Sequence, residues 1–177
     1  KKKMLEALGF VLADGRCPRQ YTLPQEKGLP VVMDLRPFID QGSWVISAVS
    51  SYLKLTGDIN FLNENCRYYK EMDNKKGMAE ESGEKGSVLE HLVRIIDYLL
   101  SNRDFENTGC IRVLYGDWND ALDGLGVSSD PEVSYGTGVS VMASLHVFRN
   151  LTDIIEILQQ VELKKYSSKI NQYVLAR

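Results

Sequence analysis

The sequence predicts an all-α fold in which paired helices stack in an array or toroid. Three observations carry this prediction. Apolar residues recur with the 3.6-residue period of a helix through much of the chain. Long connections without that period separate the periodic stretches, and one short stretch alone, Cys110–Tyr115, has the residue pattern of a strand.

Five stretches carry the helical period, and each predicts a helix with one buried face. The first two have apolar residues at 4, 5, 8, 11 and 12, and at 45, 46, 49, 52 and 53, with Ser43 as the expected N-cap of the second. The third, over residues 88–100, follows a capping box formed by Ser87 and Glu90. The last two have stripes over residues 141–158 and 163–174.

The connections hold the unusual residues. Residues 13–42 and 103–138 lack helical periodicity, and ordered loops of such length inside a compact domain are usually functional. A third connection, Asp73–Gly86, is charged, contains glycine and has no aromatic residue. This composition predicts a solvated loop without a chemical role.

Composition excludes several classes of protein. The chain has 177 residues, of which 44% are hydrophobic and 25% charged, as in an ordinary globular domain. A net charge of -3 argues against a nucleic-acid or anionic-membrane partner, and no apolar run is long enough to cross a membrane. Three widely spaced cysteines favour neither a disulfide framework nor a zinc site. We therefore expect one domain in a reducing, cytoplasmic compartment.

The loop Gly116–Gly126, "GDWNDALDGLG", combines carboxylates with an indole. Sugar chemistry uses this combination, because an indole covers the apolar C–H face of a pyranose while a carboxylic acid protonates the glycosidic oxygen. Two other interpretations stay open. The acidic residues and asparagine of the loop commonly cap turns. A calcium loop counted from Asn119 would place Ala121 where an oxygen ligand is needed, so no metal site is expected.

Four motifs resemble the cellobiose phosphorylase family, glycoside hydrolase family 94. "YGDWNDALDGLG" is similar to the family's Gly/Ala-Asp-Trp-Asn-Asp signature, and "FIDQGSW" resembles its Phe-x-Asp-Asp-Pro-Leu-Trp segment. "TGD" at 56–58 and "SVLEHLVRIID" also match, in the same order. The resemblance implies an inverting phosphorylase, with residues 1–177 as a fragment of one (α/α)6-barrel catalytic domain.

The resemblance also implies roles for single residues. Asp120 would be the general acid, Trp118 would lie against the sugar in the cleaved subsite, and Asp40 would hydrogen-bond the hydroxyls of that sugar. Asp117 is also predicted to be a substrate-binding residue, and its substitution is expected to act mainly through the geometry of the loop. Gln41, Gly42 and Ser43 depart from the family's Asp-Pro-Leu, which favours a branch such as the 1,2-β-oligoglucan phosphorylases.

Arginines in the first long connection are further candidates for substrate contacts, since a guanidinium offers a planar fork of donors. Arg19 is expected to contact sugar or phosphate, unless it is an exposed loop residue. Arg36, with Asp34, is expected either to bind substrate or to bridge the loop to the helices.

One acid is enough for this reaction, because inorganic phosphate is itself the nucleophile and no other cofactor is needed. The family builds its phosphate site mostly from residues downstream of this region. The isolated piece is therefore expected to be inactive. Its uncovered apolar helix faces are expected to make it either associate with copies of itself or be marginally soluble. The alternative function is a noncatalytic carbohydrate-binding or structural helical domain.

Overall fold

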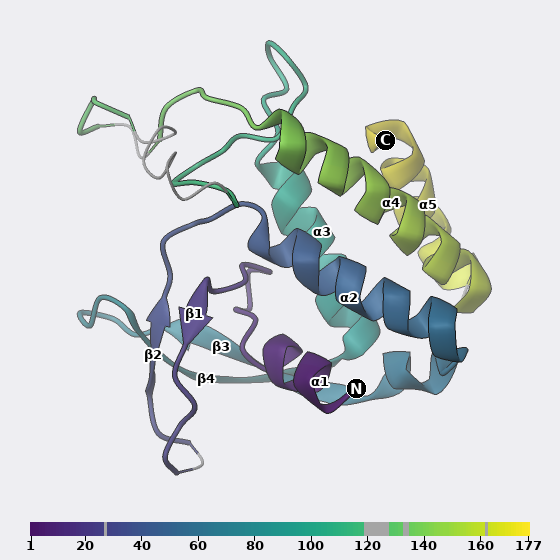
Figure 1. The fold of residues 1–177 in the computed structure, drawn as a ribbon, viewed down its shortest axis with the longest axis horizontal. Helices are drawn as coiled ribbons and strands as arrows, with labels where there is room; N and C mark the ends of the chain where they lie inside the picture. The colour runs from purple at the N-terminus through teal and green to yellow at the C-terminus, as the bar shows by residue number, and fades with distance from the viewer. Residues whose placement is uncertain (27, 119–127, 133–134, 162) are drawn as a thin grey trace.

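The computed structural model describes residues 1–26, 28–118, 128–132, 135–161 and 163–177. It contains helices and a four-stranded sheet, so the prediction of an all-α piece of a helical barrel is wrong. The sheet lies on one side of the molecule and the long helices on the other (Figure 1). In chain order the elements are α1 (Lys2–Leu8), β1 (Gln20–Tyr21), β2 (Val31–Asp34), α2 (Gln41–Thr56), the 3-10 helix η1 (Ile59–Asn63), β3 (Asn65–Glu71), β4 (Met78–Ser87), α3 (Val88–Ser101), α4 (Val141–Val161) and α5 (Leu163–Ala176).

The sheet has the order β1-β2-β4-β3, and every neighbouring pair is antiparallel. Its longest strand, β4, occupies most of the segment predicted as a solvated loop. Cross-strand ion pairs join the two charged strands: Lys70 to Glu80 at 3.0 Å and Arg67 to Glu81 at 2.8 Å. Tyr69 of β3 is fully buried beneath them. Charged residues therefore form strands here because a neighbouring strand satisfies them.

The predicted helices are present, but α1 ends at Leu8, before the predicted apolar positions 11 and 12. Ser87 caps α3 by accepting a hydrogen bond from the Glu90 N–H, and the Glu90 carboxylate accepts one from the Ser87 N–H at 2.7 Å, which confirms the capping box. Helix α2 begins at Gln41 with Asp40 as its N-cap residue, so the expected cap at Ser43 is wrong. Ser43 lies inside the helix and is fully buried.

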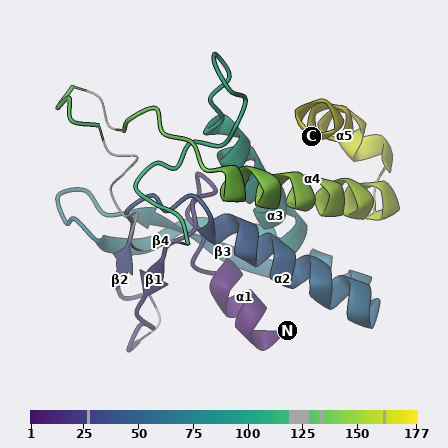
Figure 2. The ribbon, with the colours of Figure 1, turned by 45° about the horizontal axis from the view of Figure 1, so that its top comes forward.

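The core lies between the helices. Helix α2 contacts both α3 and α4, and α4 contacts α5; α2 and α4 run side by side in both views (Figure 1, Figure 2). A second, smaller cluster lies between the sheet and the segment after α1, and its buried members are Phe10, Leu12, Val31, Met33, Leu35, Tyr69 and Ala79. No helix among the described residues is long and apolar enough to span a membrane.

The strand predicted at Cys110–Tyr115 is only partly correct. Ile111, Arg112 and Leu114 each make a single isolated bridge, to Arg103, Val139 and Phe38 respectively. Leu114 has a φ of 53°, in the left-handed region that strands do not use. The chain therefore leaves regular strand geometry two residues before Gly116.

Candidate functional site

Two motifs that are far apart in the sequence are paired in space. The Ile39 N–H donates to the Gly116 carbonyl at 3.0 Å, and the Tyr115 N–H donates to the Pro37 carbonyl at 3.2 Å. Phe38 forms bridges with both Leu114 and Gly116. Residues 38–44 are called here the helix-start segment, and residues 114–118 the motif segment. The backbone pairing brings the next residue of each, Asp40 and Asp117, into one region.

Asp40 is held by side chains from the first turn of α2. Its carboxylate accepts hydrogen bonds from Trp44 Nε1 at 2.9 Å and from Gln41 Nε2 at 3.1 Å, and only 1% of the residue is exposed. Burial raises the pKa of Asp40, and the nearby charge of Asp117 adds to this rise, while the Trp44 hydrogen bond opposes it. Asp40 is thus a fixed hydrogen-bond acceptor, and keeping its buried carboxylate charged lowers the stability of the fold.

Asp117 is held from a different part of the chain. The hydroxyl of Ser140, the residue before α4, donates to Asp117 Oδ2 at 2.6 Å. Asp117 is 6% exposed and Ser140 is 7% exposed, so the bond is shielded from water. Such shielding makes the contact stronger than a surface hydrogen bond.

The residue next to Asp117 has the opposite environment. The Trp118 side chain is 60% exposed, so its indole is accessible to a ligand. Asp120, the predicted general acid, lies outside the described residues, as do Asn119 and the remainder of the loop to residue 127. Trp118 therefore marks the edge of the described site.

Arg36 bridges the two long connections. Its guanidinium donates to both carboxylate oxygens of Asp34, at 2.8 and 2.6 Å, and to the Tyr115 hydroxyl at 3.0 Å. This ion pair lowers the pKa of Asp34. Arg19 lies 4.3 Å from the centre of the Phe38 ring, which Arg36 also contacts. Arg36 and Arg19 therefore both contact Phe38, and Arg36 also contacts Tyr115, beside the paired backbone segments. The contacts of these two arginines with a ligand stay predictions.

A hollow of about 680 Å³ opens beside Arg36 and Tyr115. This volume is within the range of roughly 300–1,000 Å³ typical of ligand sites. Its wall combines aromatic surface with donors and acceptors, from residues that include Asp34, Arg16, Glu71, Lys76 and Tyr135. Aromatic surface together with polar groups suits a hydroxylated ligand. Sequence reasoning missed Tyr115 as a site residue, although it directly precedes the motif "GDWND".

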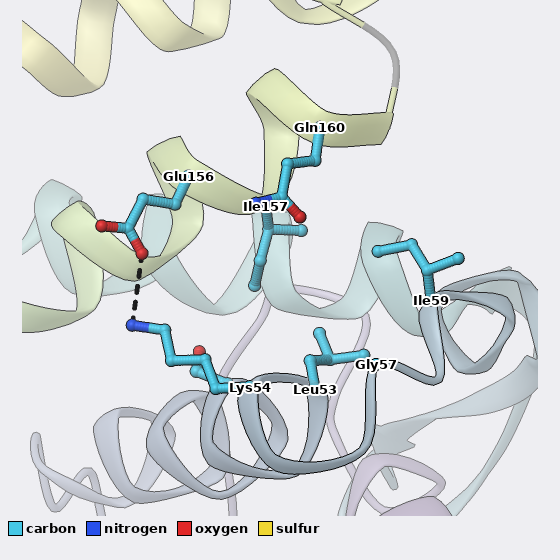
Figure 3. Close-up of a pocket in the computed structure, with 8 residues that line it drawn as sticks. Leu53, Lys54, Gly57, Ile59, Glu156, Ile157 and Gln160 are labelled. Atoms are coloured by element: carbon cyan, nitrogen blue, oxygen red, sulfur yellow. Dashed lines mark ion pairs between the residues drawn. The ribbon is translucent and has the colours of Figure 1, made fainter.

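Another hollow, of about 310 Å³, lies between the C-terminal halves of α2 and α4 (Figure 3). Leu53, Ile59 and Ile157 contribute apolar walls, and Lys54 forms an ion pair with Glu156 at 3.2 Å across it. None of the residues predicted to bind substrate lines this hollow. The 680 Å³ hollow is therefore the better candidate for a site.

A hydrogen-bond chain joins α2 to α4 behind the helix-start segment. Ser47 Oγ lies 2.8 Å from His146 Nε2 and donates to Asn150 Oδ1 at 3.0 Å, while Asn150 Nδ2 donates to the Ser43 carbonyl at 3.1 Å. The His146 ring also packs against Trp44, with ring centres 4.5 Å apart. Trp44 is 54% exposed, so its indole is not part of the core.

Metal binding has no support in the described part of the chain. No group of three or more His, Cys, Asp or Glu side chains in it is arranged to hold an ion. The carboxylates of the site are instead bound by N–H and O–H donors, as Asp40 and Asp117 show.

Comparison with known proteins places the chain in a family. Residues 24–175 match the family described as "Glycosyl hydrolase 94 superfamily, catalytic domain". The chain is 30% identical over 161 residues to solabiose phosphorylase of Paenibacillus borealis, covering 91% of this chain and 17% of that protein. It is 25% identical over 153 residues to cellobionic acid phosphorylase of Neurospora crassa, covering 86% of this chain and again 17% of the relative. The family resemblance of the motifs is confirmed: the chain belongs to glycoside hydrolase family 94 and matches its catalytic domain.

Proposed function

We propose that this chain carries the general acid and part of the sugar-binding surface of an inverting glycoside phosphorylase. The reaction would cleave a β-glucosidic bond of a disaccharide or oligoglucan with inorganic phosphate and release a sugar 1-phosphate. One observation carries the proposal: the backbone pairing of Ile39 with Gly116 brings the two family motifs together. Membership of the family supports the reaction class.

In this proposal each motif supplies a different part of the chemistry. Asp120 protonates the glycosidic oxygen as the bond to the leaving sugar breaks, and phosphate attacks the anomeric carbon from the opposite face, which inverts its configuration. The exposed indole of Trp118 packs against the C–H face of the sugar. Asp40 accepts hydrogen bonds from the sugar's hydroxyls. Its carboxylate is covered in the structure, so this contact requires a rearrangement of neighbouring side chains.

We propose that this protein acts on fewer sugars than the family as a whole. One relative is named for solabiose and the other for cellobionic acid, so related catalytic domains act on different sugars. The Gln41-Gly42-Ser43 sequence supports a substrate with another linkage, such as a 1,2-β-linked oligoglucan. Arg36 and Arg19 lie beside the paired segments, and we infer that they contact substrate.

We further propose that the 177-residue chain does not turn over substrate by itself. It spans 17% of the length of the curated relatives it matches, and no compact group of cationic side chains follows the motif in the sequence. An unplaced phosphate forfeits most of the roughly 7–11 kcal/mol that proximity and orientation contribute. The chain alone is expected to bind sugar weakly.

The test compares Asp120→Asn with Asp117→Asn in the longest polypeptide that naturally contains these residues. Asparagine keeps the shape of aspartate but has no transferable proton, so Asp120→Asn is expected to lower the phosphorolysis rate by about 10²- to 10⁴-fold. Sugar affinity, measured by titration calorimetry, is expected to survive. Asp117→Asn is expected to act through loop geometry and to lower the rate less.

Two outcomes would contradict the proposal. Equal and small losses in the two variants would mean that Asp120 is not the acid. Sugar binding without release of sugar 1-phosphate by the unmodified polypeptide would favour the noncatalytic carbohydrate-binding alternative.

A further inference from the structure

Ser140 connects α4 to the motif segment through a hydroxyl that makes two hydrogen bonds. It donates its proton to Asp117 Oδ2 at 2.6 Å and accepts a hydrogen bond from the Ala143 N–H at 3.1 Å. A hydroxyl has one proton and two lone pairs, so donating to the carboxylate and accepting from the helix are compatible. The same oxygen therefore caps α4 and orients Asp117.

The backbone of Ser140 is fixed on both sides. Its N–H donates to the Ile111 carbonyl at 2.9 Å, and its carbonyl accepts from the Ser144 N–H at 3.0 Å. Two residues earlier, the Gly138 carbonyl accepts from the Val113 N–H at 2.9 Å. These contacts tie the start of α4 to the chain just before the motif, so Ser140 is a rigid point from which to hold Asp117.

The Asp117–Ser140 contact is direct and buried, and it joins residues 23 positions apart. A hydrogen bond to an ionised partner is shorter and stronger than one between neutral groups. Its loss would leave a buried carboxylate oxygen without this donor. We expect this loss to change the orientation of Asp117 and the position of the neighbouring Trp118.

We propose that Ser140 is a positioning residue that orients Asp117 and, through it, the neighbouring Trp118. The catalytic half of this inference rests on the proposed phosphorylase function. The positioning half rests on the hydrogen bonds of Ser140 alone and can be measured without turnover. A misplacement of about 1 Å at a catalytic group can lower the rate by about 100-fold.

Three variants separate positioning from loss of stability. Ser140→Ala removes both hydrogen bonds, while Ser140→Thr keeps the hydroxyl and the cap. The matched control is Ser87→Ala, which removes the N-cap of α3 in a capping box that does not contact the motif segment. Both alanine variants are expected to lower Tm because each loses a helix cap, and Ser140→Ala is expected to lower it further because it also removes the buried hydrogen bond to Asp117.

The first readout uses this chain itself. Its two tryptophans, Trp44 and Trp118, give two 19F resonances after labelling with 5-fluorotryptophan, assigned with Trp44→Phe. Ser140→Ala is expected to shift the Trp118 resonance, Ser140→Thr to restore it, and Ser87→Ala to leave it in place. A Trp118 resonance that does not move in Ser140→Ala would overturn the inference.

The second readout is phosphorolysis by the longest polypeptide that naturally contains these residues. Ser140→Ala is expected to lower kcat by up to about 100-fold with a much smaller change in the KM for sugar. Ser87→Ala is expected to keep the original kcat. Equal kcat values for the two alanine variants would overturn the catalytic half of the inference. Absence of activity before any substitution would instead overturn the proposed function and leave the 19F result standing.

Discussion

Asp40 and Asp117 are both buried carboxylates, but the chain holds them in different ways. The donors to Asp40 are Gln41 and Trp44, one and four residues further along the same helix. Asp117 accepts a hydrogen bond from Ser140, 23 residues away at the start of another helix. The helix-start segment is therefore organised locally, whereas the motif segment depends on the placement of α4.

This difference has a physical consequence. Once α2 forms, its own 3.6-residue period brings Trp44 over Asp40, because residues four apart lie on one face of a helix. The Ser140 hydroxyl, in contrast, reaches Asp117 only through the tertiary placement of α4. The hydrogen bonds of Asp40 are therefore expected to persist in variants that disturb α4. The hydrogen bond between Ser140 and Asp117 is expected to be sensitive to such variants.

The largest effect on stability is expected from Gly42→Ala, a change within the helix-start segment. A Cβ at position 42 would lie 2.5 Å from Cγ2 of Ile95 in α3. Overpacking of this kind typically costs about 1–3 kcal/mol, although alanine is by itself the better helix former. We expect lower stability in urea unfolding and an altered environment at Asp40.

A double variant provides the control. Ile95→Ala makes room for the new methyl group, so the loss of stability in Gly42→Ala/Ile95→Ala is expected to be smaller than the sum of the single losses. A single Gly42→Ala variant as stable as the unmodified chain would show that the approach of α2 to α3 is not tight.

A smaller effect with the opposite sign is expected for Asp40→Asn. Because the folded-state pKa of Asp40 is raised, the folded chain binds its proton more tightly than the unfolded chain, and stability falls as the pH rises through the folded pKa. Asparagine has no charge to bury. Asp40→Asn is therefore expected to raise Tm at pH 7, where each kcal/mol corresponds to about 2–4 °C for a chain of this size.

The pH dependence checks the cause of that gain. The difference in Tm between Asp40→Asn and the unmodified chain is expected to shrink as the pH falls through the raised pKa, and to vanish below the ordinary value of 3.8, where Asp40 is protonated in both states. A gain of equal size at pH 3 and pH 7 would point to a cause other than buried charge.

The smallest effects concern the two donors to Asp40. The Trp44 hydrogen bond lowers the Asp40 pKa more than the Gln41 hydrogen bond does. Trp44→Phe is therefore expected to raise that pKa further than Gln41→Ala. Carboxyl 13C titration by NMR measures both values, and the reverse order would indicate that the Trp44 contact is weak in solution.

The helices were predictable because their determinants are local. The capping box at Ser87 and Glu90 and the apolar stripes of the later helices are visible within single segments, and the structure has helices in those places. The cap of α2 was misplaced because serine is a common N-cap residue, which favoured Ser43. Asp40 occupies the N-cap position instead, although its side chain makes no cap hydrogen bond.

The sheet was not predictable in the same way. Strand β4 reads Met-Ala-Glu-Glu-Ser-Gly-Glu-Lys-Gly-Ser, a sequence of residues that are depleted in strands. Backbone pairing with β3 holds this strand, and the ion pairs of Glu80 and Glu81 add to that contact between segments. An all-α interpretation followed because no local pattern marks such a strand.

The site was predictable in part. The motifs in residues 38–44 and 116–120 were visible in the sequence, and the structure places the start of each against the other. Ser140 and Tyr115 were missed as partners of the site because only the folded chain brings them to Asp117 and Arg36. The roles of Asp120, Trp118, Asp40, Arg36 and Arg19 toward a substrate stay predictions.

The hydrogen-bond chain between α2 and α4 fixes the tautomer of His146. Asn150 donates its amide N–H to Ser43, so its oxygen accepts the only proton of the Ser47 hydroxyl. The proton between Ser47 and His146 must then come from Nε2 of the ring. A second proton would bind at Nδ1 and break none of these bonds. The contact between the two helices therefore keeps its hydrogen bonds whether the imidazole is neutral or charged.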